Sequence, residues 1–188
     1  IEGWIYPTAY PSNDYSMIVD NRNSGTNNGV SVMYNQTTGY WSYFDGNTLG
    51  VVSSTTAISL NTWSHFALVR SSTTWKLFVN GTQVISNQTS SSNIGSTAVY
   101  IATARDNPGN TRLVTGYLSN IRILNGTALY TTTFTPPSAP LTPITYTALL
   151  TCQSYNFVDN SPNNLTITRY GDTSVKTVSY THLTLPTI

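Results

Sequence analysis

The sequence predicts an all-β protein built as an antiparallel sandwich of two sheets. Short runs rich in β-branched and aromatic residues recur along the 188 residues, and turn-forming residues separate them. No segment shows the sustained 3.6-residue apolar period of an amphipathic helix. Many short strands separated by turns are typical of sandwiches and barrels. The chain is long enough for one medium-sized domain with a substantial core.

The expected strands follow one another through the first two thirds of the chain. They cover residues 2–6, 16–21, 30–35, 40–44, 55–58, 64–70, 75–79, 99–102 and 117–124. Polar stretches at residues 21–28 and 106–111 are expected to be surface loops between strands.

The clearest hairpin covers residues 62–83. Two runs of alternating side chains flank a turn of Ser and Thr, and Asn80-Gly81 then supplies the positive φ angles of a second tight reversal. The first run carries apolar groups on both faces, with Phe66 and Leu68 on one and Val69 on the other. Such a strand is expected inside a two-layer sandwich or beneath a covering loop.

The character of the sequence changes after Tyr130. Residues 136–146 are rich in proline, which lacks the N–H that a central strand needs, so we expect an extended connector there. Beyond it, strands are expected at residues 147–152 and 165–168, separated by the turn-rich stretch 159–163.

Both ends of the sequence are expected to be truncations. The chain opens inside an expected strand, without an initiator methionine. At the other end, residues 178–188 resemble the conceptual translation of a transposase-type sequencing adapter, so we expect them not to be native and leave them out of the fold. The alternative is an ordinary threonine-rich strand.

The low charge of the chain excludes two classes of partner. Charged residues make up only 8% of the sequence, against roughly 25% in an ordinary soluble domain. The net charge is +1 without any run of like charges, so the clustered basic surface that nucleic acid requires is missing. No window approaches the ~18 apolar residues of a membrane span. We therefore expect neither nucleic acid nor a membrane span.

Four segments share a distinctive order along the chain: residues 1–7 (IEGWIYP), 63–70 (WSHFALVR), 75–81 (WKLFVNG) and 116–123 (GYLSNIRI). Together they resemble the laminin-G-like jelly-roll domains of the concanavalin A-like lectin/glucanase superfamily. Each is short, but their order and spacing are specific. The resemblance implies a concanavalin A-like jelly roll for residues 1–135. Residues 125–130 (NGTALY), the connector and residues 149–152 (LLTC) also resemble repeats in tail or virion proteins of marine phages.

The resemblance leaves two interpretations of residues 147–177. In laminin-G-like domains a segment of this kind usually opens the fold, whereas here it comes last. It would then begin a second copy, the first copy would lack its own opening strands, and the parent protein would contain an array of such domains. Alternatively, these residues complete the first sandwich, as in a circular permutant. An unpaired sheet edge favours such docking.

Catalysis is not expected, although the superfamily includes β-glucanases. Retaining glycoside hydrolysis needs two carboxylates about 5–5.5 Å apart. Glu2 is the only glutamate, the aspartates are scattered, and no expected strand carries two acids. His65 lies in a strand beside Phe66 and is expected to be structural.

Calcium is the one cofactor that the resemblance implies. Laminin-G relatives can hold it at a loop rim through Asp, Asn and backbone carbonyl oxygens, the ligands that a hard cation prefers. Asp20, Asp106 and Asn107 could form such a site, although loop aspartates are also common by chance.

Carbohydrate binding is the function that the sequence favours. Ligand sites combine aromatic surfaces with a few placed polar groups. The predicted glycan site consists of Tyr40, Trp41 and Tyr43 on one expected strand, with Asp45 and Asn47 in the turn after it. Because Tyr40 and Trp41 point to opposite faces of a strand, both cannot face a single core. The alternative is that these aromatic residues are simply good strand formers.

The leading hypothesis is therefore a non-catalytic carbohydrate-binding or adhesion module of a phage tail fibre, virion or surface protein. Its expected location is the virion or the outside of a cell. Its expected partners are glycans, such as host-surface polysaccharide, and neighbouring repeats of the parent protein. A second hypothesis is a structural spacer without a ligand. A glycoside hydrolase is the third, and the missing carboxylate pair disfavours it.

Overall fold

The computed structural model describes residues 1–12, 14–23, 28–46, 49–92 and 98–176. Within these ranges the regular elements are all strands, which confirms the predicted all-β class. No helix that could cross a membrane occurs in the described part of the chain. The strands are β1 (Glu2–Pro7), β2 (Tyr15–Asp20), β3 (Ser31–Asn35), β4 (Tyr40–Phe44), β5 (Val51–Ala57), β6 (Ser64–Ser71), β7 (Thr74–Val79), β8 (Thr82–Thr89), β9 (Tyr100–Ile101), β10 (Gly116–Leu124) and β11 (Thr147–Thr151).

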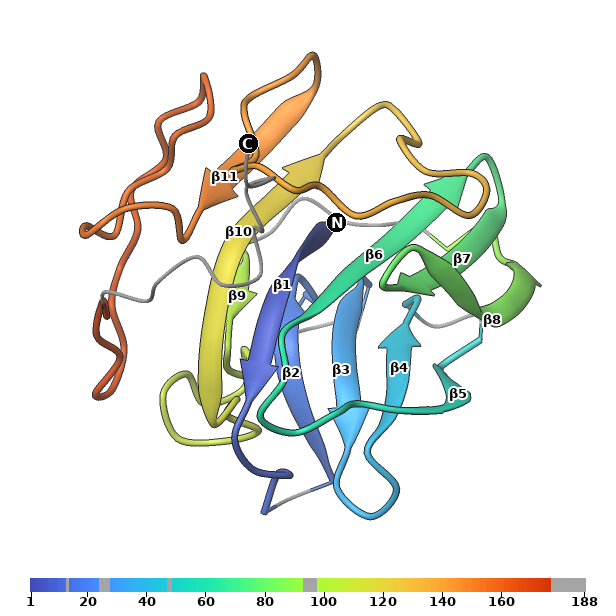
Figure 1. Cartoon of the computed structure of the whole chain (residues 1–188), viewed down its shortest axis with the longest axis horizontal. Coiled ribbons are helices and arrows are strands. Elements are labelled where there is room, and N and C mark those ends of the chain that lie inside the picture. Colours follow the sequence, from blue (N-terminus) through green and yellow to red (C-terminus); the bar gives the residue numbers. More distant parts are fainter. Residues whose placement is uncertain (13, 24–27, 47–48, 93–97, 177–188) are drawn as a thin grey trace, which may run out of the picture.

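The strands form two antiparallel sheets packed face to face, as the sequence predicts (Figure 1). The six-stranded sheet has the order β11-β10-β1-β6-β7-β8, and the five-stranded sheet has the order β5-β4-β3-β2-β9. Strands far apart in sequence are neighbours: β1 pairs with both β10 and β6. The sandwich therefore depends on long-range pairing from its first strand onward.

The main core lies between the two sheets and is built by strand alternation. Trp41 and Tyr43 of β4 face inward from the five-stranded sheet, and Phe66 and Trp75 face them from β6 and β7. The rings of Trp41 and Phe66 lie 6.2 Å apart, and Tyr43 stacks on Trp75 at 5.7 Å with an interplanar angle of 13°. Each such buried side chain stabilises the fold by about 1.5–3 kcal/mol relative to an exposed position.

The predicted hairpin is confirmed in β6 and β7, and a third strand continues it. Asn80 and Gly81 have φ angles of 48° and 78°, as a tight reversal of this kind requires. The Asn80 side chain also accepts a hydrogen bond of 2.8 Å from the His65 amide. Strand β8, which the sequence did not predict, follows this turn and pairs with β7. Its polar residues suit an edge position, where pairing rather than burial determines the strand.

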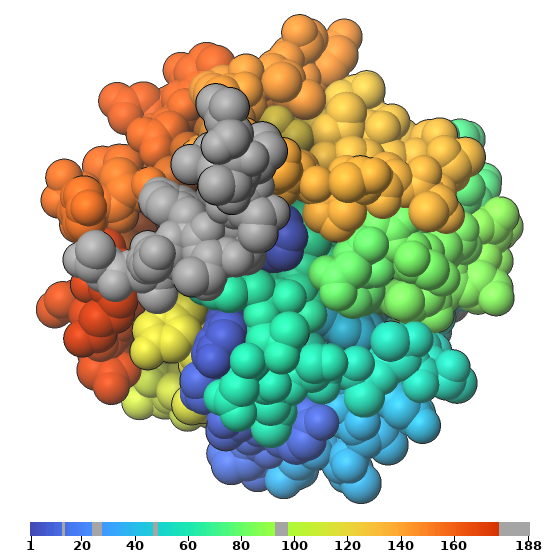
Figure 2. All heavy atoms as spheres, in the orientation of Figure 1, coloured from blue at the N-terminus to red at the C-terminus, as the bar shows by residue number. Residues whose placement is uncertain are grey.

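The segment 125–146 crosses one end of the outer face of the six-stranded sheet and covers part of β6 and β7 (Figure 1). Tyr130 and Phe134 stack at 3.7 Å and pack on Val69 and Phe78, which point away from the main core. In the space-filling view the gold and orange residues of this segment and of β11 form one continuous surface (Figure 2). The apolar groups on both faces of β6 are thus explained by a covering loop.

Strand β11 extends the six-stranded sheet by pairing with β10, from Ile121↔Thr151 to Leu124↔Thr147. Of the two interpretations of residues 147–177, this arrangement corresponds to the one in which they join the first sandwich. The strand predicted at residues 165–168 is wrong: these residues have no strand pairing, and the Leu165 amide instead donates to the buried Asp159 carboxylate. Residues 177–188, including the predicted adapter sequence, lie outside the described residues.

Candidate functional site

The outer face of the five-stranded sheet presents aromatic and hydroxyl side chains together. Strand register places Tyr40, Ser42 and Phe44 of β4 beside Ser53 and Val51 of β5. We call these five residues the β4–β5 platform. Tyr40 and Phe44 are half-buried, Ser42 is fully buried, Ser53 is exposed and Val51 is 45% exposed. Between the two aromatic residues, the hydroxyls of Ser42 and Ser53 lie 2.8 Å apart and hydrogen bond to each other.

Only one of the three aromatic residues of the predicted glycan site reaches this platform. Tyr40 is there, but Trp41 and Tyr43 are fully buried between the sheets, so assigning them to ligand stacking is wrong. The physical reason is alternation: positions 41 and 43 share the face that packs on Phe66 and Trp75. Burial also raises the pKa of Tyr43, as expected for a core hydroxyl.

Asp45 is likewise a structural residue, and its prediction as a ligand contact is corrected. Its side chain is fully buried; one oxygen accepts the Leu49 amide at 3.0 Å and the other accepts the Ser92 hydroxyl at 3.3 Å. These bonds fix the turn that follows β4, and the carboxylate does not reach the surface. Asn47 lies outside the described residues.

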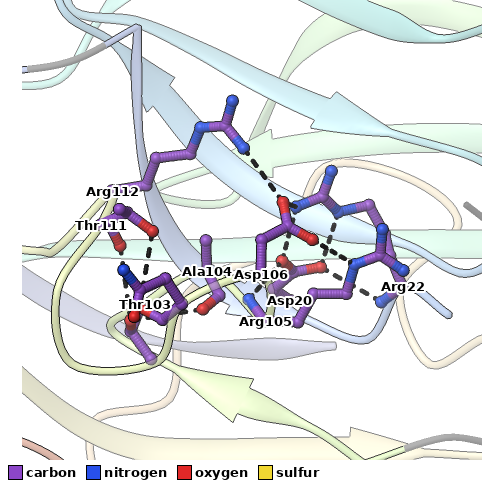
Figure 3. A network of polar contacts seen from close by, with 9 residues as sticks. Asp20, Arg22, Thr103, Ala104, Arg105, Asp106, Thr111 and Arg112 are labelled. Carbon is purple, nitrogen blue, oxygen red and sulfur yellow. Dashed lines mark hydrogen bonds and ion pairs between the residues drawn. The ribbon is translucent and has the colours of Figure 1, made fainter. Parts of the chain in front are cut away.

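One end of the platform borders a cluster of ion pairs (Figure 3). Asp20, at the end of β2, is fully buried, and its two oxygens accept the Arg22 guanidinium at 2.8 and 2.7 Å. The Arg105 amide also donates to Asp20, at 3.1 Å. The Arg22 guanidinium lies 5.7 Å from the centre of the Phe44 ring, within the range of a cation–π contact. The cluster thereby joins β2, β4 and the loop after β9.

The predicted calcium site falls on this cluster, and arginines occupy the place of the cation. Asp106 contacts Arg105 at 2.9 Å, Arg112 at 3.5 Å and Arg22 at 4.0 Å. Three guanidinium groups thus surround the two carboxylates of Asp20 and Asp106 and leave the cluster with a net positive charge, which repels Ca²⁺. The calcium assignment of this pair is therefore wrong.

Asn107, the third predicted calcium ligand, serves its own loop. Its carbonyl accepts the Asn110 amide at 3.1 Å and its side-chain oxygen accepts the Asn110 side-chain amide at the same distance. In the described part of the chain, no three His, Cys, Asp or Glu side chains gather to hold a metal ion.

The opposite face of the sandwich contains a second ionic cluster, beneath the covering segment. Glu2, the only glutamate, is buried and accepts the Arg122 guanidinium at 2.6 and 3.0 Å through one oxygen. Its other oxygen accepts the Tyr130 hydroxyl at 2.9 Å and lies 3.4 Å from His65 Nε2. Burial raises the pKa of Glu2, but the contacts from His65 and Arg122 outweigh it and hold that pKa below its ordinary value of 4.5.

A cavity of about 540 Å³ lies beside this cluster, between the sheet and residues 124–130. Glu2 and Arg122 form part of its wall but neutralise each other. His65 is fully buried among aromatic rings, including an edge contact with Trp4 at 5.2 Å, which agrees with the structural role expected for it. The outer face of the six-stranded sheet also carries partly exposed aromatic rings: the Tyr6 ring lies 5.6 Å from Trp63 and 5.9 Å from Tyr117 between ring centres. We place the candidate site on the β4–β5 platform because it combines two aromatic side chains with the exposed Ser53 hydroxyl.

Neither carboxylate cluster fits the two-acid mechanism of glycoside hydrolysis. Glu2 is enclosed by Arg122 and Tyr130, and Asp20 is enclosed by Arg22 and the Arg105 amide. A general acid must reach the glycosidic oxygen of a bound sugar. Two buried carboxylates saturated with hydrogen bonds do not have this access.

Sequence reasoning missed Ser42, Phe44, Val51 and Ser53, as well as the arginines. The signal for Phe44 was present: if Trp41 and Tyr43 face inward, then Tyr40, Ser42 and Phe44 must face outward. The spacing of Asp20 with Arg22 was a further local signal for an ion pair. The partnership of the 102–112 loop with β2 depends on folding and has no local signal.

Comparison with known proteins agrees with this architecture. No curated protein matches the chain. Among solved structures, a Bacteroides ovatus protein whose proposed function is carbohydrate binding matches with a TM-score of 0.56 and 17% identity, over 84% of this chain and 47% of that protein. The present chain thus spans about half of that relative. A heptameric SAP-like pentraxin from Limulus polyphemus matches with a TM-score of 0.45 and 17% identity, over 63% of this chain and 59% of the pentraxin.

The family assignment comes from the N-terminal 131 residues. Residues 1–131 match a laminin-G-type family described as the concanavalin A-like lectin/glucanases superfamily. This range runs from the start of β1 to the middle of the covering segment and includes both sheets except β11. The chain belongs to the concanavalin A-like lectin/glucanases superfamily.

Proposed function

We propose that this chain is a non-catalytic carbohydrate-binding module whose ligand lies on the β4–β5 platform. The observation that carries the proposal is the pairing of two outward aromatic side chains, Tyr40 and Phe44, with the exposed Ser53 hydroxyl between them, which the buried Ser42 hydroxyl holds at 2.8 Å. Aromatic rings can stack on the apolar faces of sugar rings, and hydroxyls can exchange hydrogen bonds with sugar hydroxyls.

The spacing of the platform suits an extended ligand. Positions 40 and 44 lie four residues apart on one strand, so their Cα atoms are about 13 Å apart. A ligand that touches both rings is therefore an oligosaccharide or a polysaccharide segment rather than a single sugar. The Arg22 guanidinium beside Phe44 provides additional donors at one end.

The test is a glycan array with the purified chain, followed by calorimetric titration of the best ligand. Replacing Tyr40→Ala or Phe44→Ala should weaken binding at least tenfold, about 1.4 kcal/mol, because each removes a stacking surface. Tyr155→Ala is the matched control, because Tyr155 is 74% exposed and lies away from the platform; it should bind as the unchanged chain does. Binding that survives both platform substitutions would place the ligand elsewhere, and no binding to any glycan would favour the structural spacer.

Two further measurements test whether binding needs a metal ion and whether the bound glycan is hydrolysed. Binding should be unchanged by EDTA, because arginines and not a metal ion neutralise Asp20 and Asp106. Prolonged incubation with the bound glycan should release no reducing ends, in keeping with a module that binds without hydrolysis. A loss of binding in EDTA, or the appearance of new reducing ends, would contradict the corresponding part of the proposal.

We further propose a place for the module on a virion or a cell surface, as part of an adhesive protein that contacts host polysaccharide. The support is the resemblance of residues 125–130 and 149–152 to repeats of phage tail proteins, together with the neutral, hydroxyl-rich composition. Sequencing the complete parent gene tests this, because neighbouring tail or surface domains are expected beside the module. A gene encoding an intracellular enzyme around it would overturn the proposal.

A further inference from the structure

The C-terminal segment 147–165 is a small unit that largely satisfies itself. The Asp159 carboxylate accepts the amides of Leu150, Ser161 and Leu165 at 3.0, 2.8 and 2.9 Å. The Asn160 amide donates to the Leu150 carbonyl at 2.7 Å. These bonds cover the outer edge of β11, so one edge of this strand is capped by its own segment. The other edge pairs with a partner strand.

The partner strand of β11 is β10, and a small set of contacts joins the two strands. Besides the ladder between β10 and β11, the Asn120 amide donates to the Cys152 carbonyl at 3.0 Å. The Gln153 side chain donates to Asn120 Oδ1 at 2.8 Å. Leu149 and Leu150 are 7% and 0% exposed where β11 meets the sheet. The acceptor edge thus recognises β11 by main-chain pairing and two buried leucines, as in recognition by β-strand addition.

The link between the acceptor and its strand is short and strained. Residues 143–146 are all exposed, and the link begins after Thr142, whose carbonyl accepts Arg122. Within the link, the Tyr146 carbonyl accepts the Asn125 amide, and Ile144 is hydrogen bonded to Thr147, the first residue of β11. Tyr146 has a φ of 70°, an unfavourable conformation for a bulky residue, and its side chain is 59% exposed. Short strained hinge loops favour domain swapping, because straightening the hinge relieves the strain.

We propose that β11 exchanges between two copies of this chain, so that segment 147–165 of each copy pairs with β10 of the other. The partner is a second copy because every contact between β11 and β10 is available unchanged in trans, so the exchange requires no new complementary surface. When two copies are related by a two-fold axis, the β10 edge of each copy is paired with β11 of the other, and the dimer is closed.

The hinge length limits how the two copies can lie. Four extended residues span about 13–14 Å, so the β10 edges of the two copies must face each other. The β4–β5 platforms lie on the other sheet and stay exposed in each copy. The exchanged dimer therefore presents two platforms, and this pairing is independent of whether a glycan binds there.

Single cysteines on two different chains test the exchange. Ile123 and Leu149 are paired positions of β10 and β11. In a Cys152→Ala background, one chain carries Ile123→Cys and the other carries Leu149→Cys. The two are mixed, unfolded, refolded together at high concentration and oxidised. Exchange predicts a disulfide-linked heterodimer, identified by non-reducing electrophoresis and by mass spectrometry of the linked peptide.

The matched control replaces the second chain by one with Tyr155→Cys, which is more exposed and lies outside the ladder. Severalfold more heterodimer with Leu149→Cys than with this control supports exchange, and equal amounts overturn it. Leu124→Cys with Thr147→Cys provides a second register pair if the first disturbs folding. Tyr146→Gly should lower the dimer fraction in size-exclusion chromatography, because glycine adopts positive φ without strain; an unchanged fraction would contradict the role of the hinge.

Discussion

The two outer faces of this sandwich differ in how far a chain segment covers them. On the six-stranded sheet, residues 125–146 cover part of the face and enclose the Glu2–Arg122 ion pair beneath Tyr130. On the five-stranded sheet, the loop after β9 covers only part of the face, where Ala104 packs on Met17 and Met33. The platform on β4 and β5 keeps partly exposed rings and the exposed Ser53 hydroxyl.

The contrast shows which charges stabilise the fold and which surface remains for a ligand. The Glu2–Arg122 pair on the covered face is buried and hydrogen bonded, so it contributes to folding. On the other face, the buried charge of Asp20 holds a loop in place, while Tyr40 and Phe44 are only half-buried. Substitutions on the covered face should therefore affect stability, whereas substitutions on the platform should affect binding.

The largest effect is expected from Arg122→Ala. This change leaves the buried Glu2 carboxylate without its main partner, and breaking a buried ion pair costs about 3–5 kcal/mol. The free energy of unfolding, measured in urea, should fall by this amount. The matched control is Arg112→Ala, because the Arg112 side chain is 32% exposed and its ion pair with Asp106 is worth at most about 1 kcal/mol. Similar losses in the two variants would refute the distinction between the faces.

A smaller loss is expected from Phe134→Ala in the covering segment. The Phe134 ring stacks on Tyr130 and contacts Phe78 at 5.6 Å, but the side chain is only half-buried. We expect a loss of about 1–3 kcal/mol in unfolding free energy, below the 3–5 kcal/mol of a fully buried phenylalanine. Hydrogen exchange should then accelerate at the Phe134 and Gly81 neighbourhood while the core of the five-stranded sheet stays protected. Uniform acceleration throughout would mean that the segment is not a separate cover.

Acid should weaken the covered face and the β11 segment first. Bonds from His65 and Arg122 lower the pKa of Glu2 despite its burial, and backbone amides do the same for Asp159. Carboxyls with depressed pKa values stabilise the fold above their ordinary values, 4.5 and 3.8, and this contribution disappears as pH falls through the folded-state values. Urea unfolding at a series of pH values should therefore show decreasing stability below about pH 4.5. In Glu2→Gln this decrease should be smaller; an unchanged pH profile would show that Glu2 does not contribute to it.

Features that depend on neighbouring residues could be predicted from the sequence, whereas features that depend on distant partners could not. The Asn80-Gly81 reversal, the β6–β7 hairpin and the all-β class depend on neighbouring residues, so they were predicted correctly. The orientation of β4 was not, because Trp41 and Tyr43 face inward only through Phe66 and Trp75, which lie far along the chain. The calcium prediction failed in a similar way, since the loop after β9 reaches Asp20 only in the folded protein.

The smallest effect on stability should come from the platform itself. Phe44→Leu removes the ring beneath Arg22 and should cost about 0.5–1 kcal/mol, the value of an exposed cation–π contact. Tyr40→Ala should change the free energy of unfolding even less, because its side chain is only half-buried and lies outside the hydrophobic clusters of the described residues. If these variants unfold at nearly the same urea concentration as the unchanged chain but lose glycan binding, the platform serves binding rather than stability. If Tyr40→Ala instead costs as much as Phe134→Ala, then the platform is packed like the covered face and its aromatic residues serve the fold.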